Sequence, residues 1–201
     1  MKRIAIRSAL FAAVGLMALP AASSAFQFGA QINREPSNSV PPRSCAQDSN
    51  VGLASPCTRV LISSENGFAG GNLKSPKDGV VTQFRIRAGG PGSIRFKLVR
   101  LRNVNQANST AEGKAHAKSQ KFTVQGRGFD AVNPVESFNV NLTVKKGDYV
   151  AIEGSKTTAQ RCTQGSPRQL MWSPSLKVGD PFRKNDAHAN CTLMVQAVGH
   201  T

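Results

Sequence analysis

The chain has 201 residues, with 26 basic against 11 acidic side chains and a formal net charge of +15. This length fits one β-sandwich or barrel domain, or one ordinary domain with appendages, and is short for two full catalytic domains. A hydrophobic content of 39% suffices for a core, and 18 Gly with 11 Pro indicate many turns but exclude a disordered or collagen-like chain.

Residues 1–25 predict a secretory signal peptide. Lys2, Arg3 and Arg7 form a positive n-region, and the apolar run from Ser8 to Leu19 is too short to span a bilayer comfortably. Small residues then lead to Ala25, so cleavage there would leave Phe26 as the first mature residue. A retained membrane anchor is the alternative. We expect export to the periplasm or the extracellular space, and no transmembrane segment in the mature chain.

Residues 26–44 mix Pro, Ser and Asn with little periodicity, which is typical of a flexible leader or linker. A single domain is expected over residues 45–201.

Four cysteines lie in this exported region: Cys45, Cys57, Cys162 and Cys191. In an oxidising compartment they predict two disulfides, for which three pairings exist. We favour Cys45 with Cys57 and Cys162 with Cys191, because each pair is close in sequence. A zinc site is the competing use, but the chain has no Cys-x-x-Cys and no His at ligand spacing from a cysteine, so no metal is expected.

Apolar residues of the expected domain recur at every second position, most clearly at Phe138, Val140, Leu142 and Val144. Eight short strands result, near residues 58–62, 80–87, 94–98, 121–125, 138–145, 149–153, 169–172 and 192–198. Three long polar loops are expected at 103–117, 154–168 and 173–190. We therefore predict an all-β fold, a two-sheet antiparallel sandwich like a jelly roll, with an immunoglobulin-like topology as second choice.

Three segments carry a resemblance: residues 75–102, which begin SPKDGVV, residues 138–153, with VKKGDYV, and residues 172–176, WSPSL. They look like an uncharacterised family of secreted bacterial β-sandwich (jelly-roll-like) proteins. The resemblance covers about residues 57–198. Its motifs describe turns and core strands, so it implies the fold and transfers no catalytic or binding residue. The loop at 103–117 and the high basicity depart from the pattern.

The sequence contains few residues in patterns that are typical of catalytic sites. The chain has three His and no G-x-S-x-G, and its carboxylates are scattered, mostly in turns. The segment from Asp180 to His188 could hold a cation, but it lacks the Asp/Asn alternation of a calcium loop. We expect neither an enzyme nor a cofactor. A hydrolase that uses carboxylates from the long loops is the less favoured alternative.

The strands at 80–87 and 94–98 are basic on one face. If they are hairpin neighbours with Ile86 and Phe96 in the core, Arg87 lies opposite Arg95 and Arg85 opposite Lys97. Like charges directly opposed destabilise a sheet, so these four side chains predict an anion-binding face. The alternative is that the charges only keep an exposed sheet soluble.

Trp172 and Tyr149 are the candidates for stacking on a sugar ring, although Trp172 could equally be a buried anchor. Nucleic acid is not expected as the cognate ligand, because the phenylalanines of the strands alternate inward. We expect a monomeric, secreted, non-catalytic binding domain for cell-envelope or extracellular polyanions or polysaccharides. A passive structural or surface protein without a specific ligand is the alternative.

Overall fold

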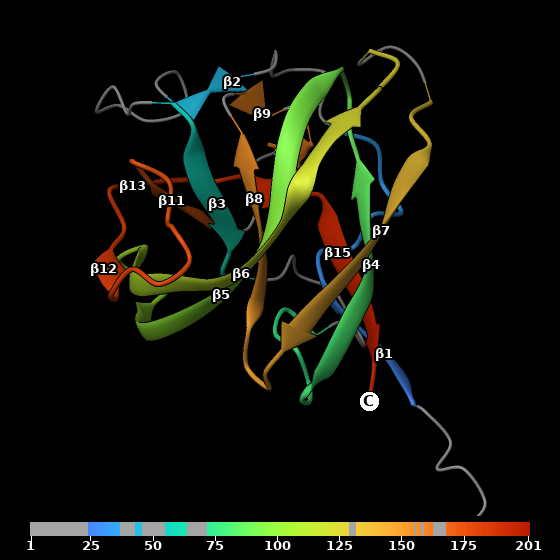
Figure 1. Ribbon diagram of the computed structural model, residues 1–201. Helices are drawn as coiled ribbons and strands as arrows, with labels where there is room; N and C mark the ends of the chain where they lie inside the picture. Colours follow the sequence, from blue (N-terminus) through green and yellow to red (C-terminus); the bar gives the residue numbers. More distant parts are fainter. Residues whose placement is uncertain are drawn as a thin grey trace, which may run out of the picture.

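The computed structural model describes residues 24–36, 43–45, 55–63, 72–128, 132–154, 156–157, 159–162 and 168–201. The expected signal peptide lies outside this part of the chain, apart from Ser24 and Ala25. The named elements are all β-strands, and two large sheets contain eleven of them (Figure 1).

The four-stranded sheet has the order β1-β15-β4-β7. Its strands are β1 (Ala25–Gly29), β15 (Val195–His200), β4 (Gly79–Arg87) and β7 (Val135–Val144). Each strand pairs antiparallel with its neighbours.

The seven-stranded sheet has the order β12-β6-β5-β8-β3-β11-β13 and is also antiparallel. Its strands are β12 (Arg183–Lys184), β6 (Thr110–Val124), β5 (Gly92–Asn105), β8 (Tyr149–Gly154), β3 (Cys57–Leu61), β11 (Gln169–Trp172) and β13 (Ala187–Ala189). Two small ribbons pair β10 (Gln160–Arg161) with β14 (Thr192–Leu193) and β2 (Arg43–Ser44) with β9 (Lys156–Thr157).

The connectivity is that of a jelly roll. Its eight principal strands in chain order are β1, β3, β4, β5, β6, β7, β8 and β15. The four-stranded sheet contains β1, β15, β4 and β7, which are the first, eighth, third and sixth of these strands. The centre of the seven-stranded sheet contains β6, β5, β8 and β3, which are the fifth, fourth, seventh and second. Strands β11, β12 and β13 come from the insertion between β8 and β15 and widen the second sheet. The predicted all-β antiparallel sandwich is confirmed.

The main core fills the space between the two sheets. Phe84 of β4 stacks on Phe96 of β5 with ring centroids 4.5 Å apart and an interplanar angle of 5°. Both side chains are fully buried, as are Ile86 and Leu98. The alternation seen in the sequence therefore has the expected cause, which is burial of one face of each strand.

A second core covers the other face of the seven-stranded sheet. Trp172 is fully buried in this core, and Leu176 and Val60 belong to the same cluster. A Cβ atom on Gly113 would lie 2.7 Å from Cζ2 of Trp172, so the ring can approach β6 only because residue 113 has no side chain.

The start of the expected leader is a strand, and the leader prediction is wrong for this part. Strand β1 pairs along its length with β15, and Phe26 and Phe28 are buried in the main core. An apolar pattern of only two phenylalanines is too short to stand out as a period. Most of residues 37–44 lies outside the described part of the chain.

The prediction of a long loop at 103–117 is also wrong. These residues form the tip of the β5–β6 hairpin, with a turn at 106–109. The inward positions of β6 here are Ala111, Gly113 and Ala115, which are small and give a weak hydrophobic signal. The missing side chain of Gly113 makes room for Trp172. The other two expected loops contain the short strands β9, β10, β12 and β13.

The predicted disulfide pairing is confirmed: Cys45 bonds Cys57, and Cys162 bonds Cys191. The second bridge lies beside the β10–β14 ribbon, and the first joins the start of β3 to the β2 segment. No described cysteine is free.

Candidate anion-binding face

The four basic residues expected to form one face do not lie together. Arg85 and Arg87 belong to β4 in the four-stranded sheet, whereas Arg95 and Lys97 belong to β5 in the seven-stranded sheet. The predicted pairs Arg87–Arg95 and Arg85–Lys97 are therefore wrong. Residues 88–91 carry the chain across the sandwich, and the same alternation suits strands that face each other across a core as well as neighbours in one sheet.

Strand β5 instead meets like charges on β6. Arg95 lies directly opposite Lys121, and Lys97 directly opposite Lys118. Directly opposed residues share one face of a sheet, and here it is the face turned away from Phe96 and the main core. We call Arg95, Lys97, Lys118 and Lys121 the basic face.

The charge balance of this hairpin is strongly positive. Residues 92–124 contain seven basic residues and one acidic residue, Glu112, which pairs with Arg102. Glu153 of β8 is the acid that reaches the basic face, 3.1 Å from Arg95 and in an ion pair with Lys97. Lys118 and Lys121 are exposed and form no ion pair among the described residues.

Lys97 is the buried member of the basic face, with 1% of its side chain exposed. Its Nζ donates to Ser175 Oγ (2.8 Å), to Thr58 Oγ1 (3.4 Å) and to the Leu176 carbonyl oxygen. Burial lowers the pKa of Lys97 against the opposing influence of Glu153. The polar groups around it satisfy its donors and tie the chain after Trp172 onto the sheet.

Glu153 links the buried and exposed parts of the site. Ser175 Oγ donates to its Oε2 at 2.6 Å. Burial alone would raise the pKa of Glu153, but Lys97, Ser175 and Arg95 together hold that pKa below its usual range. Glu153 is therefore a fixed anion whose two oxygens are already engaged.

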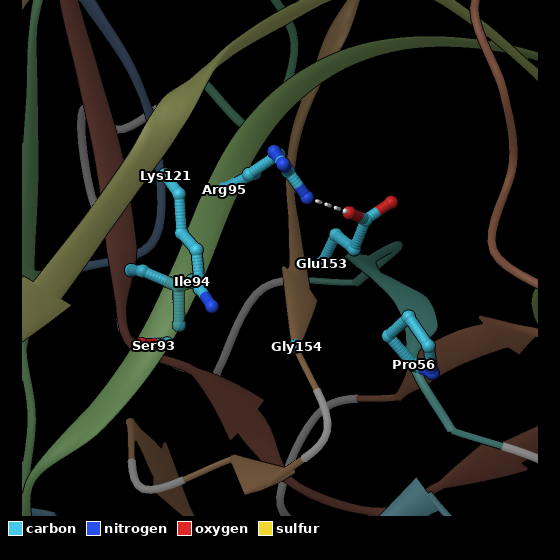
Figure 2. A pocket seen from close by; sticks show the side chains of 7 residues that line it. All are labelled: Pro56, Ser93, Ile94, Arg95, Lys121, Glu153 and Gly154. Atoms are coloured by element: carbon cyan, nitrogen blue, oxygen red, sulfur yellow. Dashed lines mark hydrogen bonds and ion pairs between the residues drawn. The ribbon is translucent and has the colours of Figure 1, made fainter.

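A pocket of about 130 Å³ opens beside the basic face. Its lining includes Pro56, Arg95, Lys121, Glu153 and Gly154. Figure 2 shows Arg95 pointing toward Glu153, with Lys121 on the adjacent strand. The volume suits a small oxyanion such as a phosphate, sulfate or carboxylate group and is too small for a drug-sized ligand.

The two candidate stacking residues do not lie in this site. Trp172 is fully buried and its Nε1 donates to the Arg183 carbonyl oxygen at 2.8 Å. Tyr149 is 3% exposed, and Lys74 Nζ lies 5.4 Å from its ring centroid. Stacking on a ligand is therefore contradicted for both rings, because each serves as a packing anchor of the second core.

The acids of the segment from Asp180 to His188 hold the local chain. Asp186 accepts from the Ser173 amide at 2.8 Å and pairs with Arg183 at 2.9 Å, and Asp180 accepts from the Lys177 amide at 3.2 Å. Within the described ranges, no three His, Cys, Asp or Glu side chains come together as metal ligands.

A different buried acid lies at the far end of β8. Asp148 accepts from Arg100 Nε at 2.7 Å and from the Lys145 amide at 2.7 Å, and His116 Nε2 lies 3.1 Å from its Oδ2. Burial alone would raise the pKa of Asp148, but His116, the Lys145 amide and Arg100 hold that pKa below its usual range. The cluster joins β5, β6 and the β7–β8 turn.

No protein-family model matches the chain, and neither a curated protein nor a solved structure is found to match it. In the part of the chain that the structure describes, no helix has the length and apolar character needed to cross a membrane.

Sequence reasoning found Arg95 and Lys97 but missed Lys118 and Lys121. Both lysines lie in β6, which has a bulge opposite the step from Arg95 to Lys97 and another opposite the step from Leu98 to Val99. Each bulge inserts an extra residue and breaks the period of two, so no simple alternation marks Lys118 and Lys121 as lying on one face.

Proposed function

We propose that the protein is an exported, non-catalytic binding domain for cell-envelope or extracellular polyanions, and that the basic face holds them. The observation that supports this most directly is the pair of like-charge contacts Arg95–Lys121 and Lys97–Lys118. Each such pair costs a few tenths of a kcal/mol to about 1 kcal/mol in a sheet, and among the described residues Glu153 is the one acid paired with the face. An anionic ligand would remove that repulsion.

In this proposal the exposed and buried cations act differently. Lys118, Lys121 and Arg95 contact phosphate, sulfate or carboxylate groups directly, because their side chains reach solvent. Lys97 contributes a buried positive charge behind them and holds Glu153, which in turn orients the Arg95 guanidinium beside the pocket. No aromatic side chain is among the described residues that line the pocket beside the face, which favours charge over base or sugar stacking as the basis of recognition.

Export is part of the proposal. Two disulfides are typical of chains that fold in an oxidising compartment, and the first 25 residues have the pattern of a signal peptide. The resemblance to uncharacterised secreted β-sandwich proteins agrees with this location but supplies no ligand.

The test is binding of the mature protein, residues 26–201, to wall teichoic acid, alginate, duplex DNA and phosphatidylglycerol vesicles at several salt concentrations. The variant Lys118→Gln/Lys121→Gln should weaken binding to the preferred polymer and reduce the slope of log K against log salt by roughly one for each lysine. The matched control is Lys146→Gln/Lys184→Gln. It removes the same charge from two exposed lysines without a described ion pair, away from the basic face.

If both double variants weaken binding equally, binding depends on the overall positive charge and not on the basic face. The alternative of a passive structural or surface protein without a specific ligand is then preferred. Binding by the wild type that is weak for every polymer and lost at physiological salt would lead to the same conclusion.

A further inference from the structure

The outer face of the four-stranded sheet carries a second set of polar side chains. On β4, Gln83, Arg85 and Arg87 alternate with the buried Phe84 and Ile86 and therefore point away from the core. The register places Gln196 of β15 and Ser137 of β7 directly on either side of Arg85. Asn139 lies opposite Gln83 in the same way.

Apart from Asn139, these side chains line an open groove of about 550 Å³, a volume within the usual range for small-molecule sites. The other wall includes Ile32 and Asn33, from the chain that follows β1. Glu35 fixes this chain against the sheet: its carboxylate pairs with Arg87 at 3.0 Å and accepts from the Asn133 amide at 3.0 Å. The segment that forms this wall is therefore held against the sheet by specific contacts, and the groove is part of the folded structure.

The two arginines of the groove differ in their partners. Arg87 is neutralised by Glu35, and its side chain is only 16% exposed. Arg85 donates from Nε to Gln83 Oε1 at 2.8 Å, and no carboxylate of the described residues reaches its guanidinium. Arg85 therefore lines the groove with a charge that no carboxylate of the described residues neutralises.

The neighbours of Arg85 specify more than charge. Gln83, Gln196, Asn33 and Ser137 offer amide and hydroxyl groups, which can donate and accept, and Ile32 and Val135 add apolar contact. A guanidinium recognises a planar carboxylate through two parallel hydrogen bonds, and amide groups match the hydroxyls of a sugar. A uronic acid carries both features on one ring.

We propose that this groove binds a uronic-acid oligosaccharide, with Arg85 on the carboxylate and Gln83, Gln196 and Ser137 on the ring hydroxyls. The site is independent of the basic face, because the two lie on the outer faces of different sheets.

The test is titration of the mature protein with trigalacturonate, trimannuronate and triglucuronate, followed by calorimetry and by amide chemical shifts. We expect saturable binding of at least one of them and shifts at residues 83–87, 137 and 196. The methyl ester of the preferred sugar, which lacks the charge, should bind at least tenfold more weakly. Arg85→Gln should lose at least tenfold in affinity for the acid, and Ser137→Ala/Gln196→Ala should also weaken it.

Lys146→Gln/Lys184→Gln serves as the control, because it removes two exposed charges outside both the groove and the basic face, and it should leave uronate affinity within twofold of wild type. The proposal is overturned if none of the three sugars binds, if the methyl ester binds as well as the acid, or if Arg85→Gln binds like wild type. It is also overturned if Lys118→Gln/Lys121→Gln loses uronate affinity and Arg85→Gln does not, a result that would assign the uronate to the basic face. Unfolding midpoints of all variants establish that they are folded.

Discussion

The ring of Trp172 lies against the backbone of Gly113, in a position where a Cβ atom on residue 113 would be 2.7 Å from Cζ2 and 2.9 Å from Cε2. This contact joins β11 to β6 over the second core and brings the chain after Trp172 to Lys97. The glycine is thus required by packing, since no positive φ is involved.

Gly113→Ala should lower the free energy of unfolding by about 1–3 kcal/mol, because an added methyl group must displace a fully buried ring. Gly92→Ala is the matched control in β5, where the nearest atom to a new Cβ is Val124 Cγ2 at 3.9 Å. That change should be neutral or stabilise by up to about 1 kcal/mol, since alanine is less costly than glycine in a strand. Urea unfolding of both variants compares them, and equal losses would show that the Trp172 contact is not the cause.

Glu153→Gln should destabilise the fold by about 3 kcal/mol, in the range measured when one partner of a buried ion pair is removed. The reason is that Lys97, 1% exposed, would remain charged without its anion. Lys97→Met/Glu153→Gln should recover part of this loss, because it also removes the buried cation. A double variant less stable than Glu153→Gln would contradict this account.

Stability should fall in acid, partly through Asp148. A carboxylate whose pKa is lower in the folded than in the unfolded state stabilises the protein above its unfolded pKa, here 3.8, and loses that contribution as the pH falls through the folded-state pKa. Glu153, with an ordinary pKa of 4.5, acts in the same direction. Asp148→Asn should therefore be less stable at pH 7 and show a shallower loss between about pH 5 and pH 2. Denaturant unfolding across this range measures both, and parallel curves for the two proteins would argue against the Asp148 contribution.

Loss of either disulfide should destabilise the protein, more so for the longer span. Loop-closure entropy predicts about 2.8 kcal/mol for Cys45–Cys57, separated by 12 residues, and about 3.6 kcal/mol for Cys162–Cys191, separated by 29. Paired Cys→Ser variants, compared by denaturant unfolding, measure the two effects. A thiol assay on the unreduced, denatured wild type should detect no free thiol, and a positive reaction would contradict the pairing.

Much of the fold could be predicted from local patterns. Alternation at 80–87, 94–98 and 138–144 has one physical cause, burial of one strand face, and it is readable without knowing the partner strand. Turn residues and the close spacing of the cysteines likewise carry their information within a few residues of the chain. These features are sufficient to predict an all-β sandwich with two disulfides.

The candidate sites depended on tertiary structure. Period-two alternation indicates which side chains share a face of one strand, but it does not indicate which strand lies beside it. The pattern alone therefore does not assign Arg85 and Arg95 to different sheets. The pairing of β5 with β6, which brings Arg95 opposite Lys121, arises over a long hairpin with bulges that change the period. The burial of Phe26 and Phe28 depends on β15, about 170 residues away in the chain. Strand partners so distant in sequence are selected by the packing of the whole sandwich, so only the folded structure decides them.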